Sequence, residues 1–413
     1  MDHIQKILDD AIAQVPRRAL ERRLAAKFKH LGIAVSDAAT ATLVRQIFDG
    51  KTTVVHVDGG SDDITINLTQ EDFDYVTTVA EQFTNEQLPA LVEKMSDKAA
   101  AAIFKSLAKG WRQEANAQRA DVDAFRDRLE HRWGKALGKL RLLLTISREW
   151  GATAHERRRT KRNSDPTHLE KVLLRLHVRA CQITNEIIVL LENGFADGAM
   201  ARWRTLHEVA TVASVIAIHG EEMAERYVHH QVVEAYKGLI AYERDHVGLR
   251  FKPISKKESQ RIRKAYAAAV RRFGTKFAEE YGWAAHHLAL KGKERVTFAR
   301  LEQEAGDSYM RSPYKLASHI VHAGPRGAYF RLGSIDGSPH FLAGASNAGL
   351  TEPAQHTAVS FSELTMRVIG DSPIFDDVVA LKIIARLSAE IPIDFWKAEQ
   401  KLRRDDRRHR RNT

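Results

Sequence analysis

The feature that most constrains the fold of this 413-residue sequence is a run of apolar residues, spaced three and four apart, that begins at residue 169. Ser164-Asp165-Pro166 precedes the run as a helix-start signal, and Asn193-Gly194 follows it as a stop. The apolar positions are Leu169, Val172, Leu173, Leu176, Ala180, Ile183, Ile187, Leu190 and Leu191. This spacing places them on one face of a helix, which predicts packing in a helical bundle.

Helical patterns continue through most of the remaining chain. We expect helices at residues 197–218, 221–246, 256–272 and 275–290, with Gly220 separating the first two. Another helix is expected at residues 308–322. A glycine-rich passage, 323–349, is then expected to form short extended pieces, and three helices to complete the chain.

Residues 1–115 are predicted to form short helices around one hairpin. Ser36 is expected to cap a helix that runs to Phe48, and residues 52–57 and 64–68 to pair as strands. Residues 116–163 are predicted to be a charged helical connector with a basic loop, 164–400 a bundle core, and 401–413 a basic tail. The predicted fold is therefore mainly α, a helical bundle with a helical N-terminal region containing a small β-hairpin.

The net charge of +11 is concentrated in two segments. Residues 156–162 (ERRRTKR) carry +4 and residues 401–411 (KLRRDDRRHRR) carry +5, which leaves +2 for the rest. Two interpretations are open: a solvated loop and a frayed tail, or two patches that bind phosphate groups. The candidate nucleic-acid-binding residues are Arg157, Arg158, Arg159, Lys161 and Arg162 in the first segment and Arg403, Arg404, Arg407 and Arg408 in the second.

The sequence also predicts the cellular location of the protein. Cys181 is the single cysteine, which excludes an internal disulfide framework and a multi-cysteine zinc site. The N-terminus shows no secretory signal, and the longest apolar stretch, 209–218, is about half of a membrane span. We therefore expect a cytoplasmic protein with no membrane partner.

Three groups of polar residues on predicted helices are candidates for catalysis. They are Arg204, His207 and Glu208; Arg226 and His230; and Ser318 and His322. Arg204 and Glu208 lie four apart on one helical face, where they form either an internal ion pair or part of a ligand site. His322 ends a predicted helix, where the helix dipole favours a histidine with or without a catalytic role.

No signal for a metal or an organic cofactor is found. His207-Glu208 lacks the second histidine of a zinc-protease motif, and phosphate-loop, dinucleotide and nucleophile-elbow motifs are absent. We therefore predict no cofactor. An enzyme that binds metal through some of the 19 histidines remains a third interpretation.

The central part of the sequence resembles the bacterial domain of unknown function 5677 family over about residues 165–330. The resemblance lies in HLEKVLLRLHVRACQITNEIIVLLENGFADGAMARWRTLHEVATV, ERYVHH and YKLASHIVHAGPRG. Its most specific parts are the pattern from Arg204 to Glu208 and the pattern from Ser318 to His322. The family is similar in organisation to HEPN-type helical bundles, many of which are ribonucleases of toxin and phage-defence systems and often form dimers.

The resemblance implies an RNA-directed protein, which in one interpretation is a metal-independent ribonuclease. In that case His322 or His207 is the general base, and Arg204, with Arg226, stabilises charge on the scissile phosphate. Arg202 and His207 match the arginine–histidine spacing of HEPN nucleases but lie about 140° apart on a helix. The alternative is a non-enzymatic module that binds nucleic acid or protein through its basic segments, so whether the chain is an enzyme is left open.

Overall fold

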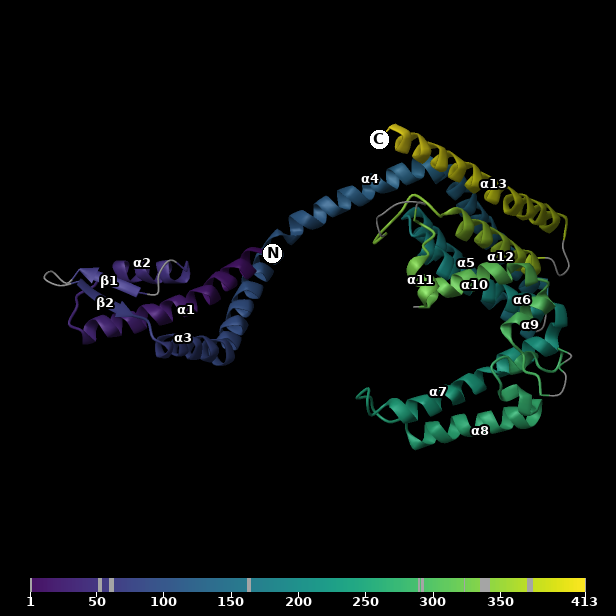
Figure 1. Ribbon diagram of the computed structural model, residues 1–413. Helices are drawn as coiled ribbons and strands as arrows, with labels where there is room; N and C mark the ends of the chain where they lie inside the picture. The colour runs from purple at the N-terminus through teal and green to yellow at the C-terminus, as the bar shows by residue number, and fades with distance from the viewer. Residues whose placement is uncertain are drawn as a thin grey trace. The chain divides into compact units, whose positions relative to one another are not determined.

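The computed structural model describes residues 2–50, 54–58, 63–161, 165–288, 290, 293–322, 324–334, 342–369 and 374–412 (Figure 1). The chain divides into two compact units, residues 1–118 and 119–413, and helix α4 (Leu88–Lys161) contributes to both. Both units are built mainly from helices, so the predicted fold class is confirmed. No helix among the described residues has the length and apolar character needed to cross a bilayer.

The first unit combines helices with one antiparallel hairpin. Its elements are α1 (Asp2–His30), α2 (Asp37–Phe48), β1 (Val54–Asp58), β2 (Asp63–Asn67), α3 (Gln70–Gln82), a π-helical turn (Phe83–Gln87) and the first part of α4. Ser36 caps α2, and a capping box formed by Thr69 and Asp72 begins α3. The hairpin pairs Val54 with Asn67, close to the predicted strands.

A small core holds the first unit together. It consists of Leu20, Leu24, Phe28, Val44 and Ile66. Beside this core, the fully buried Asp72 carboxylate accepts hydrogen bonds from Arg23 and Lys27 of α1. The two cations and the Thr69 backbone amide more than offset desolvation and lower the pKa of Asp72 well below its ordinary value. This pairing fixes α3 against α1.

The second unit is a helical bundle with one large core. Its elements are the remainder of α4, α5 (His168–Glu192), α6 (Ala196–His229), α7 (Gln231–Asp245), α8 (Lys256–Phe273), η2 (Thr275–Ala278), η3 (Gly282–Ala284), α9 (Phe298–Ala305), η4 (Ser308–Met310), α10 (Arg311–Val321), α11 (Pro325–Tyr329), α12 (Thr351–Ile369) and α13 (Phe375–Asn412). Helix α6 is central, because α5, α9, α10 and α12 all pack against it. Trp203 and Leu206 of α6 are completely buried.

Helix α13 lies along the second part of α4, and ion pairs join the two helices over most of their common length. The pairs are Arg157–Asp377, Lys139–Glu390, Lys139–Asp394, Lys135–Asp394 and Arg132–Asp405. Between them, the rings of Trp133 and Phe395 are buried with their centroids 5.7 Å apart. The order of the pairs shows that α4 and α13 run antiparallel.

This pairing corrects two expectations about the basic segments. Residues 156–161 continue α4 and do not form a loop, and residues 401–412 continue α13 and are not a frayed tail. The part of α4 after residue 118 was expected to be a connector. It instead buries Leu137 and Leu140 in the bundle core. The charged helices α4 and α13 can pack together because their apolar residues contact the core, while acids of α13 form ion pairs with bases of α4.

Other boundaries also differ from the predictions. The start signal at 164–166 precedes the helix: Thr167 is the N-cap of α5, with a capping box to Glu170, and Ser164 lies outside the described residues. Residues 275–290 were expected to form a helix, but their described part forms the short 3-10 turns η2 and η3. Two helices, α12 and α13, follow residue 350 where three were predicted, and the described part of 323–349 contains α11 and no strand.

A glycine on α4 provides a test of how closely α4 and α5 pack. A methyl group at Gly151 would lie 2.4 Å from Cε1 of the buried His177 ring on α5, whereas one at Gly138 would meet nothing within 4 Å. We predict that Gly151→Ala lowers the free energy of unfolding by about 1–3 kcal/mol through overpacking. Gly138→Ala should raise it by up to about 1 kcal/mol through helix propensity. Urea unfolding of both variants measures this, and equal effects would contradict the described packing.

Candidate functional site

Arg204, Glu208 and Tyr314 form a cluster where α10 crosses α6. Arg204 Nη2 donates a hydrogen bond of 3.0 Å to the Tyr314 hydroxyl, which donates one of 2.7 Å to Glu208 Oε1. Arg204 Nε lies 3.3 Å from the same carboxylate, and its guanidinium carbon lies 4.9 Å from the Tyr314 ring centroid. The helical spacing brought Arg204 and Glu208 together as predicted, but the tyrosine that joins them was not anticipated.

The cluster keeps part of its polar surface open to solvent. The side chains of Arg204 and Glu208 are 25% and 37% exposed, and Tyr314 is buried. Burial, together with the hydrogen bond to Glu208, raises the pKa of Tyr314 to about 12. The phenol therefore stays protonated near neutral pH and holds both charged partners in place.

His207 lies on the inner side of α6 and is not part of this exposed cluster. Its Nε2 is 3.0 Å from Glu302 Oε1 of α9, and both side chains are almost completely buried. Arg311 Nη1 donates a 2.7 Å hydrogen bond to the second oxygen of Glu302. Arg202, the other half of the nuclease-like spacing, pairs with Glu186 of α5. His207 therefore contributes to an interior network and not to a site open to substrate.

Arg226 and His230 are also interior. Arg226 donates 3.1 Å and 3.4 Å hydrogen bonds to the carbonyls of Trp283 and Phe273, and His230 Nε2 lies 3.0 Å from the carbonyl of Glu279. Burial lowers the pKa of both side chains. They attach the end of α6 to the turns that follow α8, which is a structural role.

Ser318 and His322 are not brought into contact with each other through their side chains. The Ser318 hydroxyl donates a 2.9 Å hydrogen bond to the Tyr314 carbonyl one turn earlier. His322 is exposed, ends α10 as its C-cap, and donates its backbone amide to the Ser318 carbonyl. Of the seven candidate catalytic residues, His207, Arg226 and His230 are thus buried, whereas the other four are partly or fully exposed.

A polar pocket on another side of α6 was not predicted from the sequence. A cavity of about 530 Å³ is lined in part by Asp307, Glu363 and Tyr309. The Tyr309 hydroxyl donates a 2.9 Å hydrogen bond to Glu363, and Thr211 donates one of 3.2 Å to Asp307. Burial raises the pKa of both carboxyl groups. Thr211 is 96 residues from Asp307, and Tyr309 is 54 residues from Glu363, so no local spacing could have identified these pairs.

The first basic segment is only partly available to a ligand. Arg157 Nη1 donates a 2.9 Å hydrogen bond to the nearly buried Asp377, and a second hydrogen bond joins the same pair. Arg158, Arg159 and Lys161 belong to α4, although their side chains are not described, and Arg162 lies outside the described residues. Arg157 therefore acts as a link between α4 and α13.

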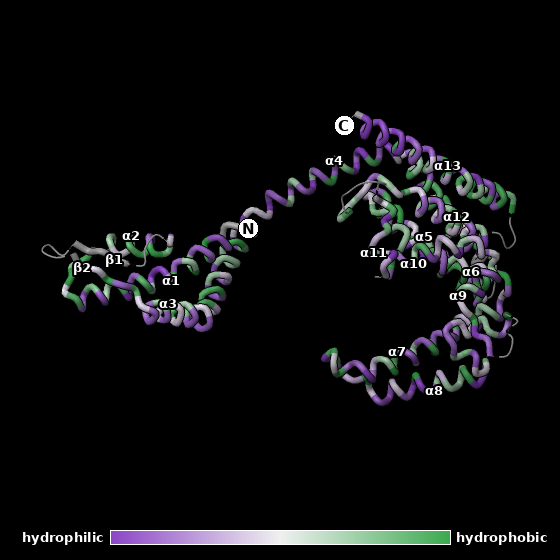
Figure 2. Tube along the Cα trace, in the orientation of Figure 1, coloured by the Kyte–Doolittle hydropathy of each residue, from purple (hydrophilic) through white to green (hydrophobic). Residues whose placement is uncertain are grey.

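The end of α13 presents a set of arginines that we call the arginine stripe: Arg404, Arg407, Arg408 and Arg411. Their spacing of three and four places them within an arc of about 100° on the helix, and all four are exposed. In the described part of the chain none of them pairs with a carboxylate; Arg404 and Arg407 donate only to carbonyls of their own helix. Figure 2 shows this end of α13 as strongly hydrophilic.

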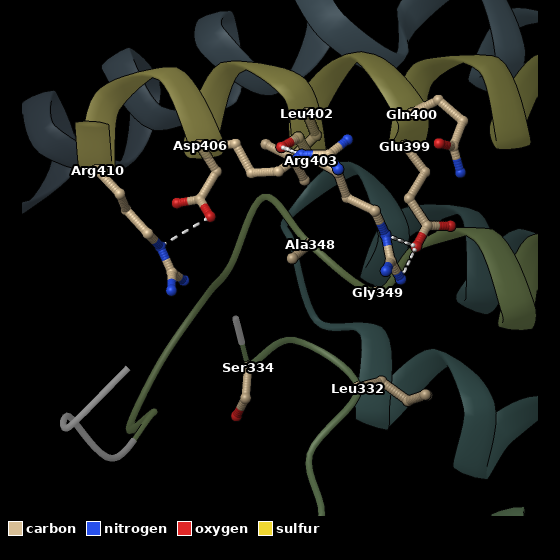
Figure 3. Close-up of a pocket in the computed structure, with 11 residues that line it drawn as sticks. Leu332, Ser334, Ala348, Gly349, Glu399, Gln400, Leu402, Arg403, Asp406 and Arg410 are labelled. Carbon is tan, nitrogen blue, oxygen red and sulfur yellow. Dashed lines mark hydrogen bonds and ion pairs between the residues drawn. The ribbon is translucent and has the colours of Figure 1, made fainter. Parts of the chain in front are cut away.

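The acids of the same segment pair with bases outside the arginine stripe. Asp405 pairs with Arg132 of α4, Asp406 with Arg410, and Glu399 with Arg403. The last two pairs line a cavity of about 450 Å³ between α13 and the loops at Leu332 and Gly349 (Figure 3). Of the predicted residues here, Arg403 is therefore neutralised by Glu399, while Arg404, Arg407 and Arg408 keep their charge available.

Histidines and carboxylates gather elsewhere without forming a metal centre. His219 Nε2 lies 3.0 Å from Glu304, and His286 and His287 approach Glu222 at 3.7 and 3.5 Å. No group of three or more His, Cys, Asp or Glu side chains in the described ranges is placed to hold one ion. Cys181 is free, and burial raises its pKa to about 11, so it is not an activated thiol.

Comparison with known proteins identifies the central region. Residues 170–339 match the model of a family of unknown function, DUF5677. No curated protein and no solved structure matches the chain. The matched region contains Arg204, Glu208, Tyr314 and His322, whereas the arginine stripe lies beyond it.

Proposed function

We propose that this chain, which carries the DUF5677 region at residues 170–339, binds RNA through the arginine stripe at the end of α13. The observation that carries the proposal is the segregation of charge on one helix: Arg404, Arg407, Arg408 and Arg411 share an exposed face and pair with no carboxylate among the described residues. Arginines spaced by one helical turn can contact successive phosphates of a nucleic-acid backbone. The interaction is expected to be electrostatic and independent of base sequence.

The anchoring of α13 supports this proposal over a structural role for the stripe. A basic residue near a helix C-terminus is favoured by the dipole without any ligand. Here, however, the contacts that hold the helix to α4 use Asp394 and Asp405, which point to a different side from the stripe. The stripe therefore contributes little to folding and is free to bind an anionic partner.

The choice of RNA and a role in a toxin or phage-defence system rest on the resemblance to HEPN-like bundles. A homodimer is proposed on the same basis. These are proposals by analogy with a fold class and depend on experiment. A cytoplasmic location is proposed from the sequence, which shows no secretory signal and no long apolar stretch.

The first test is charge reversal of the stripe. The triple variant Arg404→Glu, Arg407→Glu and Arg408→Glu should weaken binding of labelled single-stranded RNA at least about tenfold, because three phosphate contacts are lost. Fluorescence anisotropy between about 50 and 200 mM salt should show the slope of log K against log salt reduced by about 2.

A control variant distinguishes loss of binding at the arginine stripe from an effect of the protein's overall net charge. Lys94, Lys98 and Lys382 are exposed and lie outside the stripe, and their replacement by glutamate changes the charge equally. The control should bind RNA nearly as well as the wild-type protein. Equal weakening in both triple variants would show that only overall charge matters, and unchanged binding by the stripe variant would remove the proposal.

A second proposed activity is metal-independent cleavage of RNA at the Arg204 cluster. It is favoured by one observation: Tyr314 holds a half-buried cation and a carboxylate side by side on the surface of the DUF5677 region. Glu208 would accept the proton of a ribose 2′-hydroxyl as the new bond to phosphorus forms. Water would protonate the leaving 5′-oxygen, and Arg204 would stabilise the charge on the phosphate.

Cleavage of labelled RNA in the presence of EDTA tests this activity. We predict that Arg204→Ala and Glu208→Gln each reduce the rate at least about a hundredfold, in keeping with the loss of a charge-stabilising or proton-transfer group. Arg202→Ala is the matched control, because Arg202 lies on the same helix but pairs with Glu186. His322→Ala tests whether this exposed histidine takes part. Activity equal in all four variants would exclude the cluster as the site.

A further inference from the structure

Helices α7 and α8 form a two-helix arm of the second unit. The two helices lie side by side in Figure 1, with the connecting turn at the end away from α6. The rings of Tyr236 and Tyr266 stack with centroids 4.0 Å apart, and Val233 and Leu239 of α7 are buried. The two helices of the arm therefore pack against each other, and Val233 joins the arm to the bundle core.

The turn between these helices, residues 246–255, is well defined by local contacts. The Tyr242 hydroxyl donates a 2.8 Å hydrogen bond to the Lys252 carbonyl, and the Phe251 amide donates one of 2.9 Å to the His246 carbonyl. The Tyr242 ring is nearly parallel to the ring of Phe251. Arg250 has a φ of 58°, the one positive value at a residue other than glycine in the described part of the chain. The backbone is thus fixed in a shape that few residues adopt readily.

This turn displays three apolar side chains to solvent. Val247 is 74% exposed, Leu249 58% and Phe251 57%. They occupy alternate positions within five residues at the end of the arm, away from the bundle core. Three strongly exposed apolar side chains in one structured turn are typical of a surface that contacts another molecule.

The surroundings of the apolar group are strongly basic. Residues 244–264 contain eight Lys and Arg against two acids, and both acids already pair with arginines, Asp245 with Arg244 and Glu258 with Arg261. Five exposed cations have no ion-pair partner in the described structure: Arg250, Lys252, Lys256, Lys257 and Lys264. The partner must therefore offer negative charge around an apolar interior.

We infer that the α7–α8 turn docks on an anionic lipid surface, with Val247, Leu249 and Phe251 entering the interfacial region and the surrounding bases contacting lipid headgroups. A bilayer of acidic lipids supplies both required features, an apolar layer beneath a negative surface. Nucleic acid fits less well, because the apex is mainly aliphatic and Phe251 packs against Tyr242. This inference departs from the expectation of no membrane partner, which rested on the lack of a membrane-spanning segment. Contact by a turn needs no such segment.

Sedimentation of the full-length protein with vesicles tests this inference. At about physiological salt, the wild-type protein should sediment with vesicles of phosphatidylcholine and phosphatidylserine and remain in solution with phosphatidylcholine alone. Leu249→Asp with Phe251→Asp should reduce the binding to acidic vesicles at least about tenfold. Lys252→Glu, Lys256→Glu and Lys257→Glu together should abolish the preference for acidic lipid.

Two controls keep the result specific to the turn. Phe104→Asp with Leu107→Asp alters side chains of comparable exposure on the first part of α4 and should leave vesicle binding unchanged. The stripe variant Arg404→Glu, Arg407→Glu and Arg408→Glu should also sediment like the wild-type protein, so failure of RNA binding and failure of lipid binding are distinguished. Circular dichroism confirms that each variant remains folded.

Three outcomes would overturn the inference. The first is no sedimentation of the wild-type protein with acidic vesicles, or equal sedimentation of the turn variants. The second is a dimer that dissociates when Leu249 and Phe251 are replaced, which would assign the turn to contact between copies of this chain. The third is loss of RNA binding in the same variant without a change in vesicle binding, which would assign it to nucleic acid.

Discussion

The antiparallel pairing of α4 with α13 determines what the second unit can present to a partner. Arg157–Asp377 joins the helices near one end and Arg132–Asp405 near the other, with Trp133 buried between them. Partly buried pairs of this kind tolerate loss of one partner poorly, because the remaining charge is left without compensation. The contacts between α4 and α13 extend into the basic segment at the end of α13. That segment is therefore helical, and its arginine stripe lies on one exposed face.

Inside the bundle, helix α6 also pairs buried polar side chains with partners from other elements. Several of its buried polar side chains pair with another element: His207 with Glu302, Thr211 with Asp307 and Arg226 with the carbonyl of Trp283. A buried polar group without such a partner would cost stability. These interior residues therefore stabilise the fold. Arg204 and Glu208, toward the surface, keep part of their side chains in contact with solvent.

Sequence patterns predicted those features that depend on local structure. The single apolar face of α5, the cap at Ser36 and the interruption at Gly220 all follow from neighbouring residues, and the structure confirms them. Residues 275–290 have a helical composition, but tertiary contacts of their carbonyls with Arg226 and His230 favour short turns. Helical spacing likewise places Arg204 beside Glu208. It cannot supply Tyr314, which lies more than a hundred residues away.

The central claim is that the face of α13 carrying Arg404, Arg407 and Arg408 is the surface that holds RNA. Ultraviolet cross-linking of the full-length protein to RNA, followed by identification of the modified peptides, tests it most directly. We expect cross-links concentrated in peptides from the end of α13, and their loss at high salt. Cross-links confined to the α7–α8 arm or to the first unit would contradict it.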